Sequence, residues 1–304
     1  MNRRFPPPAA GEGPRPSSPP ESGRADAFRL PPALRLGRIA YLNVLPVYHA
    51  LECGAVPHNY ELVHAPPAVL NTLLAAGQLL ASSISSIEYA RRPERYFLLR
   101  DLAIVSDGPV QSVLLLSRLP LEELEGRRIL VSPASHTSVA LLRLLCTEYF
   151  SLTVFQEAGT IPEALAGPYP PDAFLVIGDE ALRLRRHPGY PHCLDLGEAW
   201  RRWTGLPFVF GLWAADRSLC ALPARTPPPA ELLRQARDWG LSHRERILDA
   251  AERDFPALSR EESAAYFRGL SYRLGEGEEQ GLLLFWEKLA RTGEIAAVPP
   301  LCFL

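Results

Sequence analysis

From Leu34 onward the chain alternates between two kinds of hydrophobic pattern. Short apolar runs such as 36–41 and 79–84 are typical of strands that are buried on both faces. Between such runs, segments such as 66–77 and 135–150 carry apolar residues three and four apart, which predicts amphipathic helices. This alternation predicts an α/β fold with mixed, mostly parallel sheets flanked by helices.

The α/β pattern occurs twice and is followed by an all-helical end. The second unit contains a short helix, a turn and a strand over 121–133, a strand, turn and helix over 172–186, and a last apolar strand over 205–215. Helices are predicted over 230–254, 260–270 and 278–292. We therefore expect two lobes, with 34–118 and 214–304 in lobe 1 and 119–213 in lobe 2. Because ligands of open α/β sheets bind at the carboxyl ends of the strands, the two lobes predict one shared cleft.

The first 29 residues differ from the rest of the chain. Residues 1–29 are rich in Pro, Gly and Ser and have no apolar stretch after the basic start, so they do not form a secretory signal. This composition cannot bury enough apolar surface to form a core, and we expect a flexible tail. Without a signal, we expect the protein to be cytoplasmic.

Composition excludes several classes of function. The 304 residues suffice for two lobes of ordinary size, and the formal net charge of −2 comes with no basic cluster among aromatic residues, so we expect no nucleic-acid surface. The five cysteines are scattered without a CxxC pair, which favours free thiols. No apolar run reaches 18 residues, so no membrane span is predicted. We find no dinucleotide fingerprint, phosphate loop, nucleophile elbow or metal-ligand spacing.

Neutral hydrogen-bonding side chains stand where the predicted strands end. They are Asn43 after the first strand, Ser85 and Ser86 after the second, Ser112 beside a Gly-Pro turn, and Ser135, Thr137 and Ser138 in a loop that opens a helix. Gly178 and the acidic Asp179 follow a later strand in the same way. Hydroxyls and amides donate hydrogen bonds without carrying charge. The first N–H groups of a helix are unpaired, so the loop over 132–138 is a candidate anion site.

Structural explanations remain open for several of these residues. Thr137 or Ser138 can simply cap the helix that follows, and Asp179 can cap the helix that starts beside it. His136 can be a solvated loop residue or a base. From the residues alone, the chain is a two-lobed protein that binds a small anionic molecule in a cleft of neutral donors.

Six motifs in order sharpen this interpretation. They are "IAYLNVLP" (39–46), "SSIEYA" (85–90), "SDGPVQSVLL" (106–115), "SHTSVALL" (135–142), "LVIGDEAL" (175–182) and "DLGEAWRRWTGLPFVFGLW" (195–213). In these motifs the chain resembles the chorismate dehydratases of the futalosine route to menaquinone, over residues 34–285. The resemblance implies the two-lobed fold of type II periplasmic binding proteins in a cytoplasmic enzyme.

The same resemblance implies a reaction and roles for residues. The family removes water from chorismate to give 3-[(1-carboxyvinyl)oxy]benzoate, without a cofactor or a metal. It implies catalytic roles for Asn43 and Ser112, and substrate binding by Ser86, Ser135, Thr137, Ser138, Gly178 and Asp179. The base stays open between a protein group and the enolpyruvyl carboxylate of the substrate. Two alternatives remain, namely a non-catalytic binding protein for a carboxylate solute and the later enzyme dihydroxynaphthoate synthase.

Overall fold

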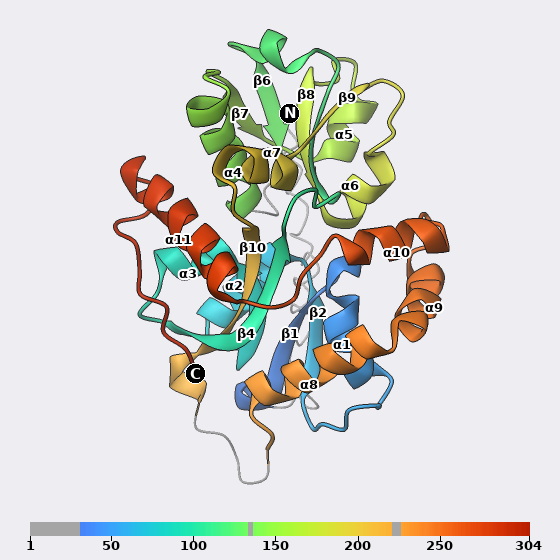
Figure 1. Ribbon diagram of the computed structural model, residues 1–304, viewed down its shortest axis with the longest axis vertical. Helices are drawn as coiled ribbons and strands as arrows, with labels where there is room; N and C mark the ends of the chain where they lie inside the picture. The colour runs from blue at the N-terminus through green and yellow to red at the C-terminus, as the bar shows by residue number, and fades with distance from the viewer. Residues whose placement is uncertain (1–30, 133–135, 221–225) are drawn as a thin grey trace, which may run out of the picture.

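The protein has two lobes, each built on a five-stranded sheet. The computed structural model describes residues 31–132, 136–220 and 226–304, so the expected tail over 1–29 and Ser135 lie outside the described residues. Figure 1 shows the lobe of the second sheet above that of the first. The predicted two-lobed α/β architecture is confirmed.

The first sheet has the strand order β2-β1-β3-β10-β4. β1 is parallel to β2 and β3, whereas β10 is antiparallel to β3 and β4. The strands are β1 (Arg35–Ile39), β2 (Glu61–Ala65), β3 (Ala81–Ser85), β4 (Tyr96–Ser106) and β10 (Phe208–Asp216). β1 and β3, inside the sheet, are nearly all buried, as their apolar runs predict.

The second sheet repeats this plan with the order β7-β6-β8-β5-β9. β6 is parallel to β7 and β8, and only β5 is reversed, being antiparallel to β8 and β9. The strands are β5 (Val113–Ser117), β6 (Arg128–Val131), β7 (Phe155–Ala158), β8 (Ala173–Ile177) and β9 (His192–Asp195). In each sheet the reversed strand is the one that arrives from the other lobe, so both sheets are mixed and mostly parallel, as expected.

The two points at which the chain passes between the lobes lie earlier in the sequence than predicted. β5 pairs with β8 and β9, so the boundary between 118 and 119 wrongly places it in lobe 1. β10 pairs with β3 and β4, so the boundary between 213 and 214 wrongly places most of it in lobe 2. The chain passes from lobe 1 to lobe 2 in residues 107–112 and returns in residues 205–207. In both places an apolar strand of the new lobe begins directly after the connecting segment.

Helices cover both faces of the first sheet. α1 (Leu45–Glu52) begins with Pro46 in its first turn, where the missing N–H costs no hydrogen bond. The expected helix over 230–254 is two helices, which meet at His243. The remaining helices of this lobe are α2 (Pro67–Ala75), α3 (Ser86–Arg91), α8 (Pro229–Ser242), α9 (Arg244–Asp254), α10 (Arg260–Arg268) and α11 (Glu276–Arg291).

The second lobe has four helices in its described part. α4 (His136–Leu144) continues into a π-helical turn over Leu145–Tyr149. The others are α5 (Ile161–Ala166), α6 (Gly178–Leu184) and α7 (Leu196–Thr204). The Asp195 carboxylate caps α7 by accepting from the amides of Gly197 and Glu198, and it also accepts from two amides of the crossing segment, those of Val110 and Gln111. One side chain thus fixes the crossing segment to the second lobe.

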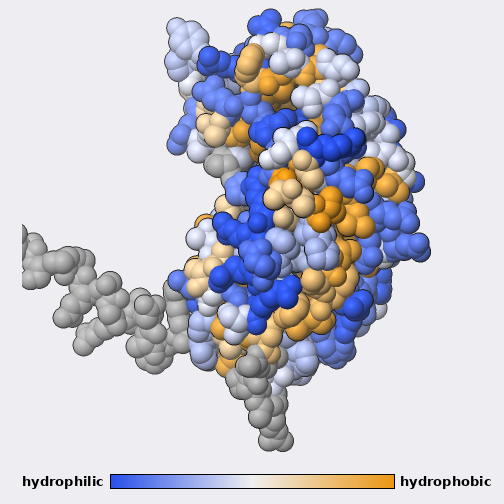
Figure 2. Space-filling view, turned by 90° about the vertical axis from the view of Figure 1, so that its left-hand side faces the viewer, coloured by the Kyte–Doolittle hydropathy of each residue, from blue (hydrophilic) through white to orange (hydrophobic). Residues whose placement is uncertain are grey.

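One apolar core runs through both lobes and holds them together. Trp200 of α7 packs edge-on against Phe208 of β10 and Phe285 of α11, so aromatic residues from both lobes meet in this core. Ion pairs bridge the lobes on two sides, from Glu262 at the start of α10 to Arg185 after α6, and from Lys288 of α11 to Glu148. Between the lobes the molecule is indented along the left edge of Figure 2.

Candidate active site between the lobes

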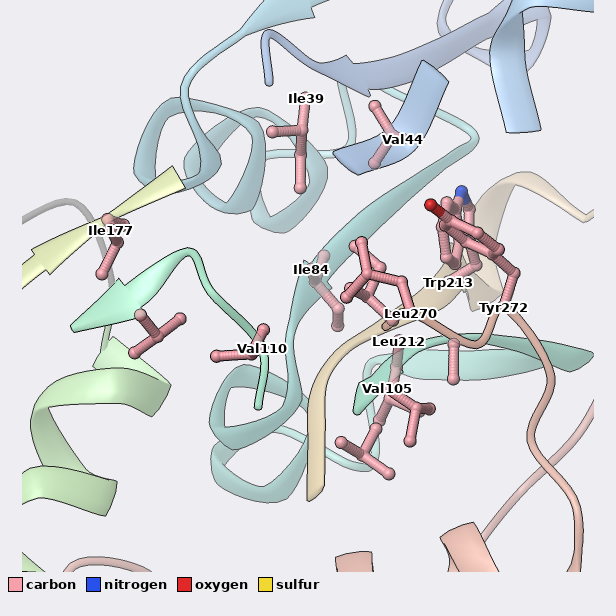
Figure 3. Packing of buried hydrophobic residues seen from close by; sticks show 14 of the residues in the cluster. Ile39, Val44, Ile84, Val105, Val110, Ile177, Leu212, Trp213, Leu270 and Tyr272 are labelled. Atoms are coloured by element: carbon pink, nitrogen blue, oxygen red, sulfur yellow. The ribbon is translucent and has the colours of Figure 1, made fainter. Parts of the chain in front are cut away.

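The candidate site is a cleft at the ends of strands from both sheets. The space between its walls is about 580 Å³, open solvent included. Its walls are mostly apolar, and Figure 3 shows Ile177 at the end of β8 approaching from one side, while Ile39, Ile84 and Val110 lie on the others. The polar side chains on the lining are Tyr41, Asn43, Ser85, Ser112 and Ser138. The predicted cleft of neutral donors is therefore present.

Asn43 lies on this lining, in a single 3₁₀ turn (Leu42–Val44) that connects β1 to α1. Its backbone carbonyl accepts a 2.7 Å hydrogen bond from the Tyr272 hydroxyl, which fixes the turn. Its Oδ1 atom is buried and has no hydrogen-bond partner among the described residues. An unpaired buried amide oxygen costs about 1–3 kcal/mol, so a ligand group that donates to it is the simplest use for this side chain.

Ser112 lies opposite, at the end of the crossing segment just before β5. Its side chain is buried, and its Oγ accepts a 3.0 Å hydrogen bond from the hydroxyl of Tyr266 on α10. Among the described residues, the acceptor for its own hydrogen is the Val110 carbonyl, at 3.4 Å from Oγ. Asn43 and Ser112 therefore share one cleft, although 69 positions separate them along the chain.

The hydroxyls expected to bind substrate divide into two groups. Of these, Ser138 in the first turn of α4 lines the cleft; Ser85 at the end of β3 also lines it, although no role in substrate binding was expected for it. Ser86 and Thr137 do not line it, because their hydroxyls contact each other across the lobes at 3.3 Å. The Thr137 Oγ1 also accepts from the Ile87 amide at 3.2 Å. Thr137 therefore caps α3 of the other lobe.

Gly178 opens α6 on the lining of the cleft. Its φ of +60° is a left-handed conformation that suits glycine, and a Cβ here would lie 2.9 Å from the Tyr41 ring. Tyr41 comes from the other lobe, so the two residues close the cleft against each other. Burial, with help from the nearby charges of Asp179 and Glu180, raises the pKa of Tyr41 to about 12, so its phenol is a neutral donor.

Asp179 lies beside the cleft but is not on its lining. Its Oδ1 accepts a 2.9 Å hydrogen bond from the Leu42 amide, across the lobes and one residue from Asn43. It is not the cap of α6, because that position belongs to Ile177. Burial raises the pKa of Asp179, partly offset by the Leu42 amide and by Arg183 and Arg38. The structure thus gives Asp179 a role in joining the lobes.

Sequence reasoning did not assign three of the tyrosines that shape this site. Tyr41 lines the cleft, while Tyr266 and Tyr272 stand behind Ser112 and Asn43. Tyr266 occupies an apolar position of a predicted helix, a pattern that only indicates burial. The position of Tyr41 at the end of the first predicted strand could have indicated that it lies at the cleft.

Charged and metal-binding groups are scarce here. The lining contains no carboxylate, imidazole or basic side chain among the described residues, and His136 is exposed outside it. No cluster of His, Cys, Asp or Glu in the described part could hold a metal ion. Within the described ranges, no helix is long and apolar enough to cross a membrane.

Comparisons with known proteins agree with this geometry. A family described as "Menaquinone biosynthesis" matches residues 34–291. A chorismate dehydratase from Thermus thermophilus is 33% identical over 84% of this chain and 94% of that protein. A 1,4-dihydroxy-6-naphtoate synthase from the same organism is 31% identical over 85% of this chain and 95% of that protein.

The fold is shared more widely than the sequence. The periplasmic aliphatic sulphonate binding protein SsuA from Escherichia coli has a TM-score of 0.59 at 16% identity, over 90% of this chain and 91% of that one. At this identity the likeness concerns the fold alone. It confirms the predicted periplasmic-binding-protein-like architecture.

Proposed function

The chain belongs to the menaquinone biosynthesis family, and we propose that it is a hydro-lyase that removes water from chorismate to give 3-[(1-carboxyvinyl)oxy]benzoate. The observation that carries this proposal is the cleft, in which neutral donors from both lobes face each other between apolar walls. The Thermus chorismate dehydratase, which matches over most of both chains, supports it.

The cleft suits the shape and charge of chorismate. The substrate has an apolar cyclohexadiene ring and two carboxylates. The isoleucine walls can enclose the ring, and the first turn of α4 with Ser138, together with Ser85, offers N–H and O–H donors to a carboxylate. A lining without acidic side chains among the described residues does not repel the dianion.

The chemistry needs placement of charge more than a strong acid. The hydrogen at C3 is vinylogous to the ring carboxylate, so its removal spreads negative charge onto that carboxylate. Loss of the C4 hydroxyl then gives an aromatic ring and one water molecule. Preorganised donors stabilise such developing charge where they already point at it, and aromatisation drives the second step.

We assign Asn43 and Ser112 to the reacting end of the substrate. The unpaired Oδ1 of Asn43 can accept a hydrogen bond from the C4 hydroxyl, and the NH₂ group of the same amide can donate to it as it leaves. The hydroxyl hydrogen of Ser112 makes one long contact within the described part of the chain, to the Val110 carbonyl, and is available to the ligand. Both groups are neutral, so neither is the base.

The base is best supplied by the substrate itself. No carboxylate or imidazole lies on the described lining. The enolpyruvyl carboxylate of chorismate hangs from C3, the carbon that loses its proton, and can take that proton within the same molecule. The protein then has to hold the side chain over the ring, which is a matter of orientation.

Turnover of chorismate by the purified protein tests the proposal. The diene absorbance should disappear as the aromatic product forms. Asn43→Ala should lower kcat by roughly 10²-fold, the scale for losing one preorganised donor, without lowering Tm. Asn71→Ala is the matched control, because Asn71 is also buried with an unpaired Oδ1 but lies outside the cleft, and its kcat should stay at the wild-type value.

Three outcomes separate the candidate functions. Unchanged chorismate in the presence of folded protein overturns the proposed reaction. Binding without turnover would indicate a binding protein. Full activity of Asn43→Ala would make Asn43 a structural amide.

A further inference from the structure

Tyr266 is buried completely within α10, behind the wall of the cleft. Its hydroxyl donates to the Ser112 Oγ at 3.0 Å. Burial raises its pKa far above the ordinary value for a phenol, so Tyr266 keeps the proton that it donates to Ser112.

The hydrogen-bond geometry at Ser112 leaves one direction for its own proton. A serine hydroxyl has one hydrogen and two lone pairs. The Tyr266 hydroxyl donates to one of the lone pairs. The distance from the Ser112 Oγ to the Val110 carbonyl oxygen is 3.4 Å, longer than the usual 2.5–3.0 Å of an O–H···O hydrogen bond. The side chain lies on the cleft lining, so the hydrogen can turn toward a ligand there.

The position of Tyr266 is fixed from several sides. The Ser259 hydroxyl and the Glu262 carboxylate form a capping box at the start of α10. Just after the helix, Ser271 exchanges two backbone hydrogen bonds with Val105 of β4. Glu262 also pairs with Arg185 of the second lobe, at 2.6 Å. The phenol is therefore held at a set distance from Ser112.

We propose that Tyr266 is a positioning residue, which orients the Ser112 hydroxyl so that its hydrogen points at the substrate. The role rests on the proposed chorismate dehydration. The Tyr266 hydrogen bond stops Ser112 from turning its lone pairs or its proton elsewhere. It also polarises the Ser112 O–H, because donors in a hydrogen-bonded chain strengthen one another. Tyr266 itself does not touch the substrate.

The test compares Tyr266→Phe with the wild type in chorismate turnover. The variant keeps the ring and removes only the hydroxyl. We expect kcat to fall about five- to tenfold, the scale of one neutral hydrogen bond, while KM changes less than about twofold. In a Ser112→Ala background the same substitution should have no further effect, because its action passes through Ser112.

Tyr48→Phe is the matched control. Tyr48 is also completely buried in lobe 1, and its hydroxyl donates to the Gly37 carbonyl at 2.7 Å, away from the cleft. It should lose stability without losing kcat. Replacing Tyr266 by 3-fluorotyrosine gives a second test that keeps the hydroxyl and makes it a stronger donor, so kcat should be at least that of the wild type.

The outcomes distinguish this inference from the proposed function. A wild type that does not turn over chorismate overturns both. An active wild type with unchanged kcat in Tyr266→Phe overturns the positioning role alone. So does an equal loss from Tyr266→Phe with and without Ser112, or a fluorotyrosine variant that loses as much activity as Ser112→Ala.

Discussion

Replacing Gly178 by alanine should both destabilise the protein and weaken its substrate binding. Gly178 has a φ of +60°, and a Cβ there would lie 2.9, 3.0 and 3.1 Å from three carbons of the Tyr41 ring. The two residues belong to different lobes and face each other at the cleft. The added methyl group therefore acts on the closure of the lobes as well as on the local backbone.

Two costs add up in this variant. The left-handed conformation costs an L-residue about 1–2 kcal/mol. Carbon atoms pack best about 3.5–4.0 Å apart, so the ring must also move by roughly 0.6 Å, and overpacking of this kind costs about 1–3 kcal/mol. If about 1 kcal/mol of that strain is relieved by opening the lobes, the ratio of closed to open molecules falls about fivefold, and KM rises by up to that factor.

Gly205→Ala separates the two costs. Gly205 has a φ of +73° at the end of α7, and nothing lies within 4 Å of where its Cβ would be, so only the backbone cost applies. Urea denaturation should show a larger loss for Gly178→Ala, by about 1–3 kcal/mol, and only this variant should raise KM for chorismate. Equal losses in the two variants, with KM unchanged, would show that the Tyr41 ring does not rest on Gly178.

Two further variants test the contacts that join the lobes. Thr137→Val keeps the shape of the side chain but leaves the Ile87 amide without its acceptor. The free energy of unfolding should therefore fall by about 1–3 kcal/mol, and KM should rise. A change in KM without a loss of stability would contradict a role in joining the lobes. Burial raises the pKa of Asp179 above its ordinary value of 3.8, so the folded chain binds more protons than the unfolded chain from that pH upward, and stability falls as the pH rises through this window. Asp179→Asn can still accept from the Leu42 amide, and it should flatten this part of the stability–pH curve in urea titrations. A curve as steep as that of the wild type would exclude Asp179 as the titrating group.

Strands with continuous apolar runs were predictable, and strands without them were not. β2 and β7 lie at sheet edges and are at most half-buried, so neither has the apolar pattern that reveals a strand. β4 is long, but Asp101 interrupts it with a φ of 59°, and its pairing with β10 shifts register there. The charge at this bulge is held by Arg237 from α8, a contact that no local pattern shows.

The candidate site was predictable where a polar residue ends a buried strand. Asn43 lies on the cleft, as this rule indicates, whereas Ser112 reaches the cleft from the position just before β5. Tyr266 could not be found in this way, because its ring satisfies the apolar pattern of a helix while its hydroxyl makes the contact that matters. A buried tyrosine has both properties, and only the fold shows which partner its hydroxyl meets.

At two ends of secondary elements, adjacent hydroxyls have different tasks. Ser85 lines the cleft while Ser86 contacts the other lobe, and Ser138 lines the cleft while Thr137 reaches across. Neighbouring side chains point in different directions at such a junction, so only one of each pair can face the ligand. The sequence shows two hydroxyls in each place and cannot tell which one faces inward without the rotation of the element.

After β1 and after β8, too, one residue lines the cleft while its neighbour contacts the other lobe. This arrangement couples the closure of the lobes to the placement of the groups that meet the substrate. Asn43 and Gly178 line the cleft, and their neighbours Leu42 and Asp179 are hydrogen-bonded to each other across the lobes. Four residues of the cleft lining are therefore one peptide unit away from a contact that exists only when the lobes are together, namely Asn43, Ser85, Ser138 and Gly178. Opening the lobes by breaking such a contact must also move the donor beside it. A loss of closure in this protein should then lower kcat together with substrate affinity, whereas in a simple binding protein of the same fold it would affect affinity alone.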